Sequence, residues 1–175
     1  MNDTQWPRFE VFHQEDPEQP HRHAGSVHAP DGEMALLNAR DVFVRRPECS
    51  SLWVAPAVAV DGGTAEELAA RNPAEPSAGP PADYLVFAKL EPRDTLTHLG
   101  EVRAVSTERA LSMAGRLCAP NRPHVLWIIA AGQVTRSEPD QALPLFAPAR
   151  DKPFRDQAFY HVQTALRRLR RQVDR

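Results

Sequence analysis

The 175-residue chain is poor in cysteine and has no long apolar run. Two cysteines, Cys49 and Cys118, are too few for a disulfide scaffold or a self-contained zinc site. Because free cysteine is usually buried, we expect both to be small core or near-core residues. No segment approaches the roughly 20 apolar residues that span a bilayer, and the N-terminus lacks the basic start and apolar stretch of a signal peptide. We therefore expect a cytoplasmic protein that does not enter the membrane.

The chain also lacks a surplus of positive charge and the common catalytic motifs. With a formal charge of -2, it has no general attraction to nucleic acid or to an anionic membrane. No glycine-rich phosphate loop follows a strand, and no Gly-x-Ser-x-Gly nucleophile elbow occurs. Neither cysteine has an activating partner close to it in the sequence. We therefore expect no catalytic residue, no cofactor site and no metal site in this chain.

Some histidines and carboxylates resemble metal-ligand patterns. The spacing Glu-x-x-His occurs at Glu10–His13, in an expected strand where residues three apart point to opposite faces, and at Glu18–His21, which flanks a proline turn. Neither pair fits a di-iron centre, which needs such pairs on the facing helices of a bundle. His23 and His28 are separated by an odd number of positions in a strand and are expected on opposite faces. Surface or interface histidines are therefore favoured over metal ligands.

An internal repeat organises the sequence. Four blocks recur in the same order: Phe9–Phe12 with Tyr84–Phe87, His23–Ala29 with His98–Ala104, Ala35–Ala39 with Ala110–Ala114, and Leu52–Val54 with Leu126–Ile128. Chance does not readily produce agreement in four separate, ordered blocks. We expect two copies of one small unit.

Each copy is expected to fold as strand, strand, helix, strand. Aromatic and β-branched residues, or alternation of apolar with polar residues, predict strands at residues 9–14, 24–29, 51–60, 84–89, 99–104 and 125–130. Asp31 and Ser106 are expected to cap helices over residues 33–46 and 107–118. Each helix has one apolar stripe, formed by Ala35, Leu36, Ala39, Val42 and Phe43 in the first and by Ala110, Leu111, Ala114, Leu117 and Cys118 in the second.

These elements predict an α+β fold of two tandem repeats with antiparallel sheets. One helix on a small sheet has little core of its own, so we expect the repeats to pack as a pseudo-dimer. The expected organisation is a first repeat at 1–60, a Pro/Gly/Ala-rich linker at 61–82 with a short helix at 64–71, a diverged second repeat at 83–135, and a tail with a basic amphipathic helix at 136–175. That basic helix is expected to pack with a solvated basic face or to dock on an acidic partner.

Several separated motifs in residues 5–58 closely resemble the phenylacetic acid degradation B family. They are Trp6–Phe12, His21–Ala29, Met34–Asp41, Arg45–Glu48 and Leu52–Val54, and Phe146–Val162 is similar to the tail of that family. The resemblance implies a non-catalytic bridging subunit of 1,2-phenylacetyl-CoA epoxidase, a ring monooxygenase of aerobic phenylacetate catabolism. It implies as partners the di-iron catalytic subunit, its helical partner subunit and the reductase. Shorter members carry one repeat before this tail, so the second repeat is a departure from the family pattern.

The candidate interface residues are Trp6, Arg22, His23, Arg45, Arg46 and Trp53, because Trp and Arg are favoured anchors at protein interfaces. Trp53 and Trp127 are equally candidates for the core, and the two arginines also suit the negative end of the helix dipole. Two other functions stay open. One is a regulatory adaptor of the oxygenase, and the other is a small-molecule-binding module, which would have convergent polar groups inside a sheet-lined cavity.

Overall fold

The computed structural model describes residues 6–44, 49–71, 79–137 and 145–147, and within them the strands form an eight-stranded antiparallel sheet. The elements are β1 (Arg8–Gln14), β2 (Arg22–His28), α1 (Gly32–Phe43), β3 (Ser51–Pro56), the 3₁₀ turn η1 (Ala57–Ala59), β4 (Val60–Thr64), α2 (Ala65–Ala70), β5 (Ala82–Lys89), β6 (Thr97–Ala104), α3 (Thr107–Leu117), β7 (Val125–Ala130), the 3₁₀ turn η2 (Ala131–Gln133) and β8 (Thr135–Arg136). The order strand, strand, helix, strand occurs twice, which confirms the predicted α+β repeats. None of the helices among these residues is long and apolar enough to span a bilayer.

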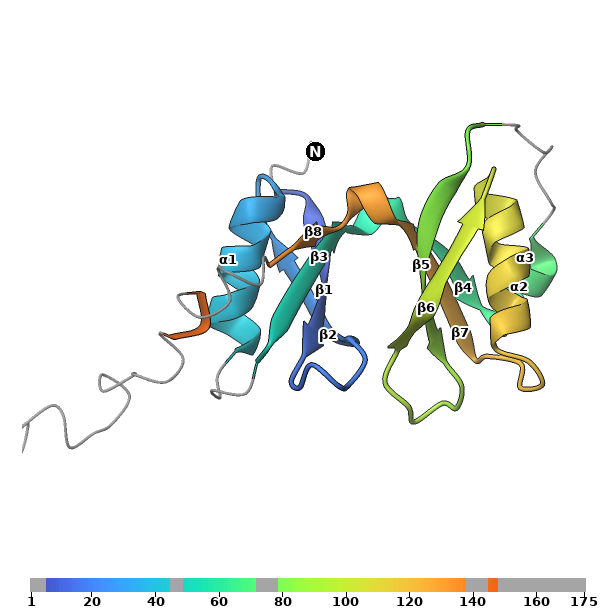
Figure 1. The fold of residues 1–175 in the computed structure, drawn as a ribbon, viewed down its shortest axis with the longest axis horizontal. Coiled ribbons are helices and arrows are strands. Elements are labelled where there is room, and N and C mark those ends of the chain that lie inside the picture. Colours follow the sequence, from blue (N-terminus) through green and yellow to red (C-terminus); the bar gives the residue numbers. More distant parts are fainter. Residues whose placement is uncertain (1–5, 45–48, 72–78, 138–144, 148–175) are drawn as a thin grey trace, which may run out of the picture.

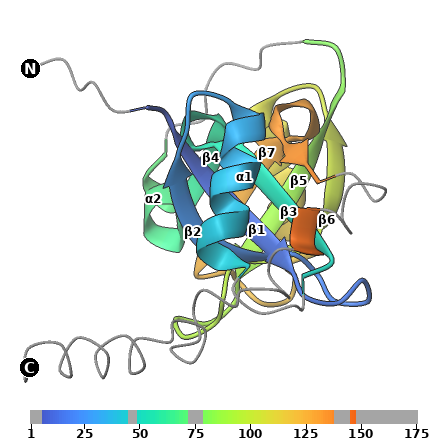
Figure 2. The same ribbon diagram turned by 90° about the vertical axis from the view of Figure 1, so that its left-hand side faces the viewer.

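The two repeats stand side by side with their helices on the outside. The strand order is β4-β7-β5-β6-β2-β1-β3-β8, so each repeat supplies three adjacent strands. Figure 1 shows α1 on the outer side of one half and α3 on the outer side of the other, and in Figure 2 α1 lies across β1, β2 and β3. The halves meet where Arg22 of β2 pairs with Thr97 of β6. This arrangement is the predicted pseudo-dimer.

Each repeat gives its last strand to the other repeat. β4 follows β3 in the chain but pairs along its length with β7, from Val60 opposite Ile129 to Thr64 opposite Val125. β8 follows β7 but pairs with β3, and Ser137 continues that contact through a hydrogen bond from its amide to the Leu52 carbonyl. The turn η1 leads the chain from β3 to β4, which lies beside β7, and the turn η2 leads it from β7 to β8, which lies beside β3. This reciprocal strand exchange completes both halves.

The exchange corrects two predictions from the sequence. The strand expected over residues 51–60 is interrupted by η1, and the start of the expected linker, at Asp61, Gly62 and Gly63, belongs to β4. Both glycines have positive φ, 128° and 159°, and a Cβ on Gly62 would collide with the Leu126 carbonyl oxygen. Gly62 therefore serves the close approach of two strands, where glycine is required, and Gly63 leaves room for the Glu67 side chain.

The core has three clusters of buried apolar side chains. The first packs α1 on its own strands around Val11, and the second packs α3 on its strands around Val86. The third lies between the halves, around Phe12 and Phe87, and takes residues from both repeats. The shared core predicted for the pseudo-dimer is this third cluster. As predicted, Cys49 packs at the edge of the first cluster and Cys118 is buried in the second.

The helix caps agree with the sequence, whereas the apolar stripes are narrower than predicted. The Asp31 and Ser106 side chains each accept a hydrogen bond from a first-turn amide. Val42 and Leu117 are 45% and 49% exposed, because they lie near the edge of a stripe whose centre is already filled by alanines against the sheet. The expected basic helix of the tail lies outside the described residues, as does Arg45–Glu48.

Candidate functional site at the junction between the repeats

Two phenylalanines form the centre of the junction. Phe12 of β1 and Phe87 of β5 occupy equivalent positions in the repeats, and neither is exposed to solvent. Their rings stack with centroids 4.1 Å apart and planes 26° apart. Because the pair lies across the pseudo-two-fold axis, contacts on one side of the junction are expected to have counterparts on the other.

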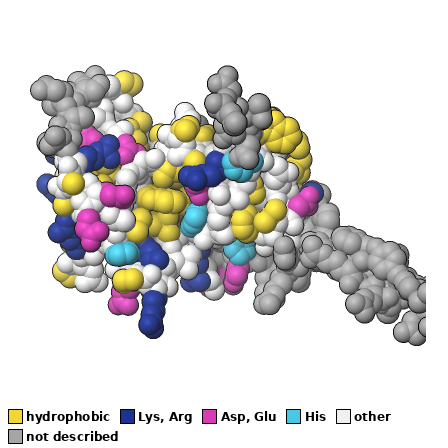
Figure 3. All heavy atoms as spheres, turned by 180° about the vertical axis from the view of Figure 1, so that it is seen from behind, with side chains coloured by type: hydrophobic (Ala, Val, Ile, Leu, Met, Phe, Trp, Pro, Cys, Tyr) yellow, Lys and Arg dark blue, Asp and Glu magenta, His cyan; other side chains and the backbone are white. Residues whose placement is uncertain are grey.

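A histidine of each repeat contacts a tryptophan of the other. His23 meets Trp127 edge to face, with centroids 5.2 Å apart and planes at 75°. His98 meets Trp53 in the same way, at 5.3 Å and 74°. Figure 3 shows the face that carries the junction, where hydrophobic side chains gather between the halves with histidines beside them. Aromatic contacts of this kind add about 0.5–1.5 kcal/mol to the burial of the rings.

A β-bulge in each repeat places these histidines. Phe12 is opposite His23 and Val11 is opposite Gly25, so Ala24 is an extra residue in β2, and Gly25 has φ 140°. The bulge changes which face His23 occupies. Phe12 and Arg8 share one face of β1, and they pair with His23 and His28. The prediction that these two histidines point to opposite faces is therefore wrong, because an inserted residue reverses the alternation along the strand.

The two histidines differ in their polar partners. His23 Nε2 lies 2.8 Å from Glu10 Oε2, and Glu10 is only 6% exposed. Arg8 Nε lies 3.2 Å from the other oxygen of this carboxylate. Leu85 stands at the position of Glu10 in the second repeat, and His98 Nε2 is buried without a hydrogen-bond partner among the described residues. The buried charge of Glu10 is thus paired, as burial requires.

His21 extends the junction on the side of Trp53. Its ring stacks on Trp53 with centroids 3.5 Å apart, and its Nε2 lies 3.0 Å from the Ser51 hydroxyl. Arg136 of β8 lies over the Trp53 ring, 4.8 Å from its centroid. Burial lowers the pKa of His21 to about 3, and burial also lowers the pKa of His98. His21 is therefore neutral at pH 7 and acts as a packing residue that also forms a hydrogen bond.

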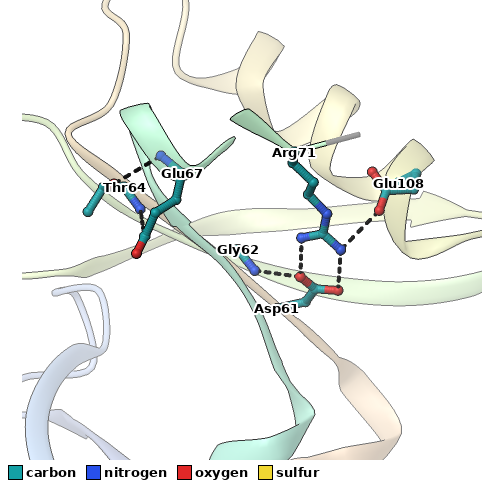
Figure 4. A network of polar contacts seen from close by, with 6 residues as sticks. All are labelled: Asp61, Gly62, Thr64, Glu67, Arg71 and Glu108. Carbon is teal, nitrogen blue, oxygen red and sulfur yellow. Dashed lines mark hydrogen bonds and ion pairs between the residues drawn. The ribbon is translucent and has the colours of Figure 1, made fainter. Parts of the chain in front are cut away.

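A second polar network fastens the exchanged strand, as Figure 4 shows. Arg71, just after α2, forms ion pairs with Asp61 of β4 and with Glu108 of α3, the latter at 2.9 Å. The hydrogen bond from Arg71 lowers the pKa of Asp61. Thr64 and Glu67 form a capping box that starts α2. Because Arg71 belongs to the first repeat and Glu108 to the second, this network joins the repeats outside the core.

The contacts at these sites are aromatic packing, hydrogen bonds and ion pairs. Catalysis through a covalent intermediate needs an activated nucleophile such as a thiolate. The thiols lie in the outer clusters, where burial raises the pKa of Cys49 to about 12 and also raises the pKa of Cys118. Among the described residues no three His, Cys, Asp or Glu side chains gather as a metal ion would need.

Of the four candidate interface residues that the structure describes, only two lie at the aromatic contacts of the junction. His23 and Trp53 both lie at the junction, on opposite sides of the pseudo-axis. Arg22 is exposed beside the β2–β6 contact, and Trp6 is 58% exposed with its carbonyl 2.8 Å from His28 Nδ1. Arg45 and Arg46 lie outside the described residues.

Sequence reasoning missed several residues of the junction. The Glu-x-x-His pattern pairs Glu10 with His13, whereas its partner in the structure is His23 on the neighbouring strand. Phe12, Phe87 and His98 could have been found by their place in the repeat, since a pseudo-two-fold axis brings equivalent residues near one another.

Known proteins resemble this chain over both of its repeats. The family model described as phenylacetic acid degradation B matches residues 5–76 and 82–167. A curated relative, the B subunit of the 1,2-phenylacetyl-CoA epoxidase of Escherichia coli (strain K12), is 45% identical over 67 residues, which are 38% of this chain and 70% of the relative. No solved structure matches. Since the family model covers both repeats, the chain belongs to the phenylacetic acid degradation B family.

Proposed function

We propose that this chain is the B subunit of a 1,2-phenylacetyl-CoA epoxidase in phenylacetate catabolism, and that it bridges the other subunits without catalysing a step itself. Its partners are the di-iron catalytic subunit, the helical partner of that subunit and the reductase. The observation that carries the proposal is the match of both halves to the B family. The similarity to the Escherichia coli protein supports phenylacetyl-CoA as the substrate of the complex.

The junction supports a structural role. Glu10 is hydrogen-bonded to His23 and His21 to Ser51, and His98 packs its ring against Trp53 and Phe87. Its aromatic rings are packed in the shared core. A site that binds substrate would keep such groups directed into a cavity for the ligand.

The proposed docking positions are Trp6, Arg22, Arg45 and Arg46. Trp6 combines a large apolar ring with 58% exposure, and Trp is among the favoured anchors at protein interfaces. Arg22 is exposed at the seam between the halves, and Arg45 and Arg46 belong to the same proposed set. His23 and Trp53 contribute by holding the two halves in one arrangement.

Coexpression with the other epoxidase subunits tests this proposal. The tagged chain, purified with them, should form a larger complex by size exclusion with light scattering, and phenylacetyl-CoA turnover with the reductase should need the chain. Trp6→Ala should weaken assembly about tenfold, a loss of roughly 1.4 kcal/mol. The matched control is Val58→Ala, at a residue that is 98% exposed.

Other outcomes would change the assignment. A complex of the remaining subunits that assembles without the chain, but turns over at a different rate when it is added, would replace bridging with regulation. An oxygenase that neither binds the chain nor responds to it would overturn the proposal.

A further inference from the structure

The outer face of α1 carries an exposed apolar pair that α3 lacks. Met34 and Leu37 lie one turn apart on α1 and are 40% and 38% exposed. The equivalent residues of α3 are Arg109 and Ser112, which are exposed as well. A single exposed apolar side chain is ordinary on a protein surface, whereas two neighbours on one helix face form a patch. Since the two helices are otherwise placed alike, as Figure 1 shows, the difference indicates a contact that only α1 makes.

Acidic side chains flank this apolar pair. Glu33 and Asp41 are both exposed on α1. Asp41 is paired with its sequence neighbour Arg40 at 2.9 Å, so Glu33 is the acidic residue open to a further partner. On α3 the counterpart of Glu33 is Glu108, which is bound in the network of Figure 4, and the counterpart of Asp41 is the exposed Arg116. The outer face of α1 therefore suits an apolar segment that also carries positive charge.

The tail of the chain begins beside this helix. Leu145 and Phe146 pack in the same cluster as Ala35 and Ala39 of α1, and Phe146 is only 5% exposed. Figures 1 and 2 both show residues 145–147, in orange-red, next to α1. Residues 148–175 follow outside the described part of the chain. The segment that continues from Phe146 thus starts next to the apolar pair.

The sequence of the tail matches that face in pattern and in length. Its apolar residues recur at helical spacing, at Val162, Leu166, Leu169 and Val173. Its positive charge comes from Arg167, Arg168, Arg170 and Arg171. A helix from Val162 to Val173 would be about 18 Å long, which is also the length of the 12-residue α1. Residues 148–161, when extended, would reach roughly 45 Å, so the apolar residues of the tail can reach any part of α1.

We infer that residues 162–173 form an amphipathic helix that packs along the outer face of α1. Its apolar side chains cover Met34 and Leu37, and its arginines lie near Glu33. A tether of roughly 15 residues gives such a segment an effective concentration on the order of millimolar at α1, which favours it over a segment of a separate protein. The inference does not depend on the proposed function, because both surfaces belong to this chain.

Cysteine cross-linking in the full chain tests the contact. Leu37→Cys combined with Leu166→Cys should be joined within one chain by a short bismaleimide, and mass spectrometry of the linked peptides separates this product from those of the native cysteines. The matched control is Ser112→Cys with Leu166→Cys, since Ser112 holds the equivalent exposed position on α3. We expect at least a tenfold lower yield for the control.

Amide hydrogen exchange tests the same contact without cysteines. In a chain that ends at residue 156, the amides of α1 should exchange at least tenfold faster than in the full chain, and those of α3 should be unchanged. Leu37→Ser, which gives α1 the residue that α3 has, should speed the exchange of α1 in the full chain and have no effect in the shortened one. Circular dichroism would show that each variant keeps its fold.

Each alternative occupant of the face would be recognised. Equal cross-linking of the Leu37 and Ser112 variants, or exchange of α1 that does not change when the tail is removed, would overturn the inference. A link that joins two chains, seen as a product of twice the mass, would assign the face to a second copy. Protection of α1 that occurs only after the other epoxidase subunits are added would assign it to one of them.

Discussion

Phe12 and Phe87, which occupy equivalent positions in the two repeats, stack on each other with ring centroids 4.1 Å apart. Each ring is fully buried. The repeats are therefore joined through a residue that each contributes from the middle strand of its half. Since the central layer of the protein belongs to neither repeat alone, damage to it should destabilise both halves together.

Truncation of one ring tests this expectation. Phe12→Ala should lower the free energy of unfolding by about 3–5 kcal/mol, since it removes a fully buried ring and leaves a cavity. Chemical denaturation followed by circular dichroism measures the change, with Val58→Ala as the exposed control. A loss below about 1 kcal/mol, or a transition in two steps, would show that the halves do not share this core.

The exchanged strand β4 depends on Gly62. Gly62→Ala should destabilise the protein by more than about 1 kcal/mol, because φ is 128° and the new Cβ would collide with the Leu126 carbonyl. Gly132→Ala is the matched control, since nothing lies within 4 Å of its Cβ position. Equal melting temperatures for the two variants would argue that β4 does not lie against β7.

The exchange also predicts what happens when the chain is cut between the repeats. A protease site inserted after residue 75, between α2 and β5, should allow cleavage into two fragments that elute together. Each fragment would still supply the other with its terminal strand, β4 or β8. The melting temperature should then rise with protein concentration, as in any two-chain assembly. Separate elution of the fragments under native conditions would contradict the exchange.

Acid should weaken the fold through His21. Its pKa is about 3 in the folded protein against an ordinary value of 6.5, so between these values the unfolded chain binds a proton that the folded chain does not. The stabilisation is complete above pH 6.5 and is lost as the pH falls toward 3, by at most about 1.4 kcal/mol per pH unit.

The control is His21→Leu, because the second repeat has Leu96 at that position. Urea denaturation between pH 4 and 7 should show a flatter dependence on pH for this variant than for the wild type. Identical slopes would indicate that the pKa of His21 is the same in the folded and the unfolded chain, which would contradict its burial.

Local patterns allow most elements to be predicted. Asp31 and Ser106 precede apolar stripes, and both act as caps. The strand predicted at Val125–Ala130 is observed with the same bounds. A run of branched apolar residues next to a tryptophan is typical of a buried strand. The repeat itself predicts a shared core, because neither unit could bury a helix and a sheet alone.

Pairing between distant segments could not be predicted in this way. The sequence places Asp61-Gly62-Gly63 at the start of a linker, and only the neighbouring strand β7 shows why Gly62 has to be a glycine. Regular alternation puts His23 on the wrong face because the bulge at Ala24 has no clear signal in one sequence.

The reciprocal exchange of β4 and β8 makes the duplication hard to reverse in evolution. Deletion of the first repeat would remove β4 and leave β7, with its buried Ile128 and Ile129, as the edge of a sheet. An apolar edge strand with unpaired amides is a template for aggregation. Deletion of the second would expose β3 in the same way. Each half therefore relies on the other for its last strand, and a chain reduced to one repeat would need a second copy of itself to supply the missing strand.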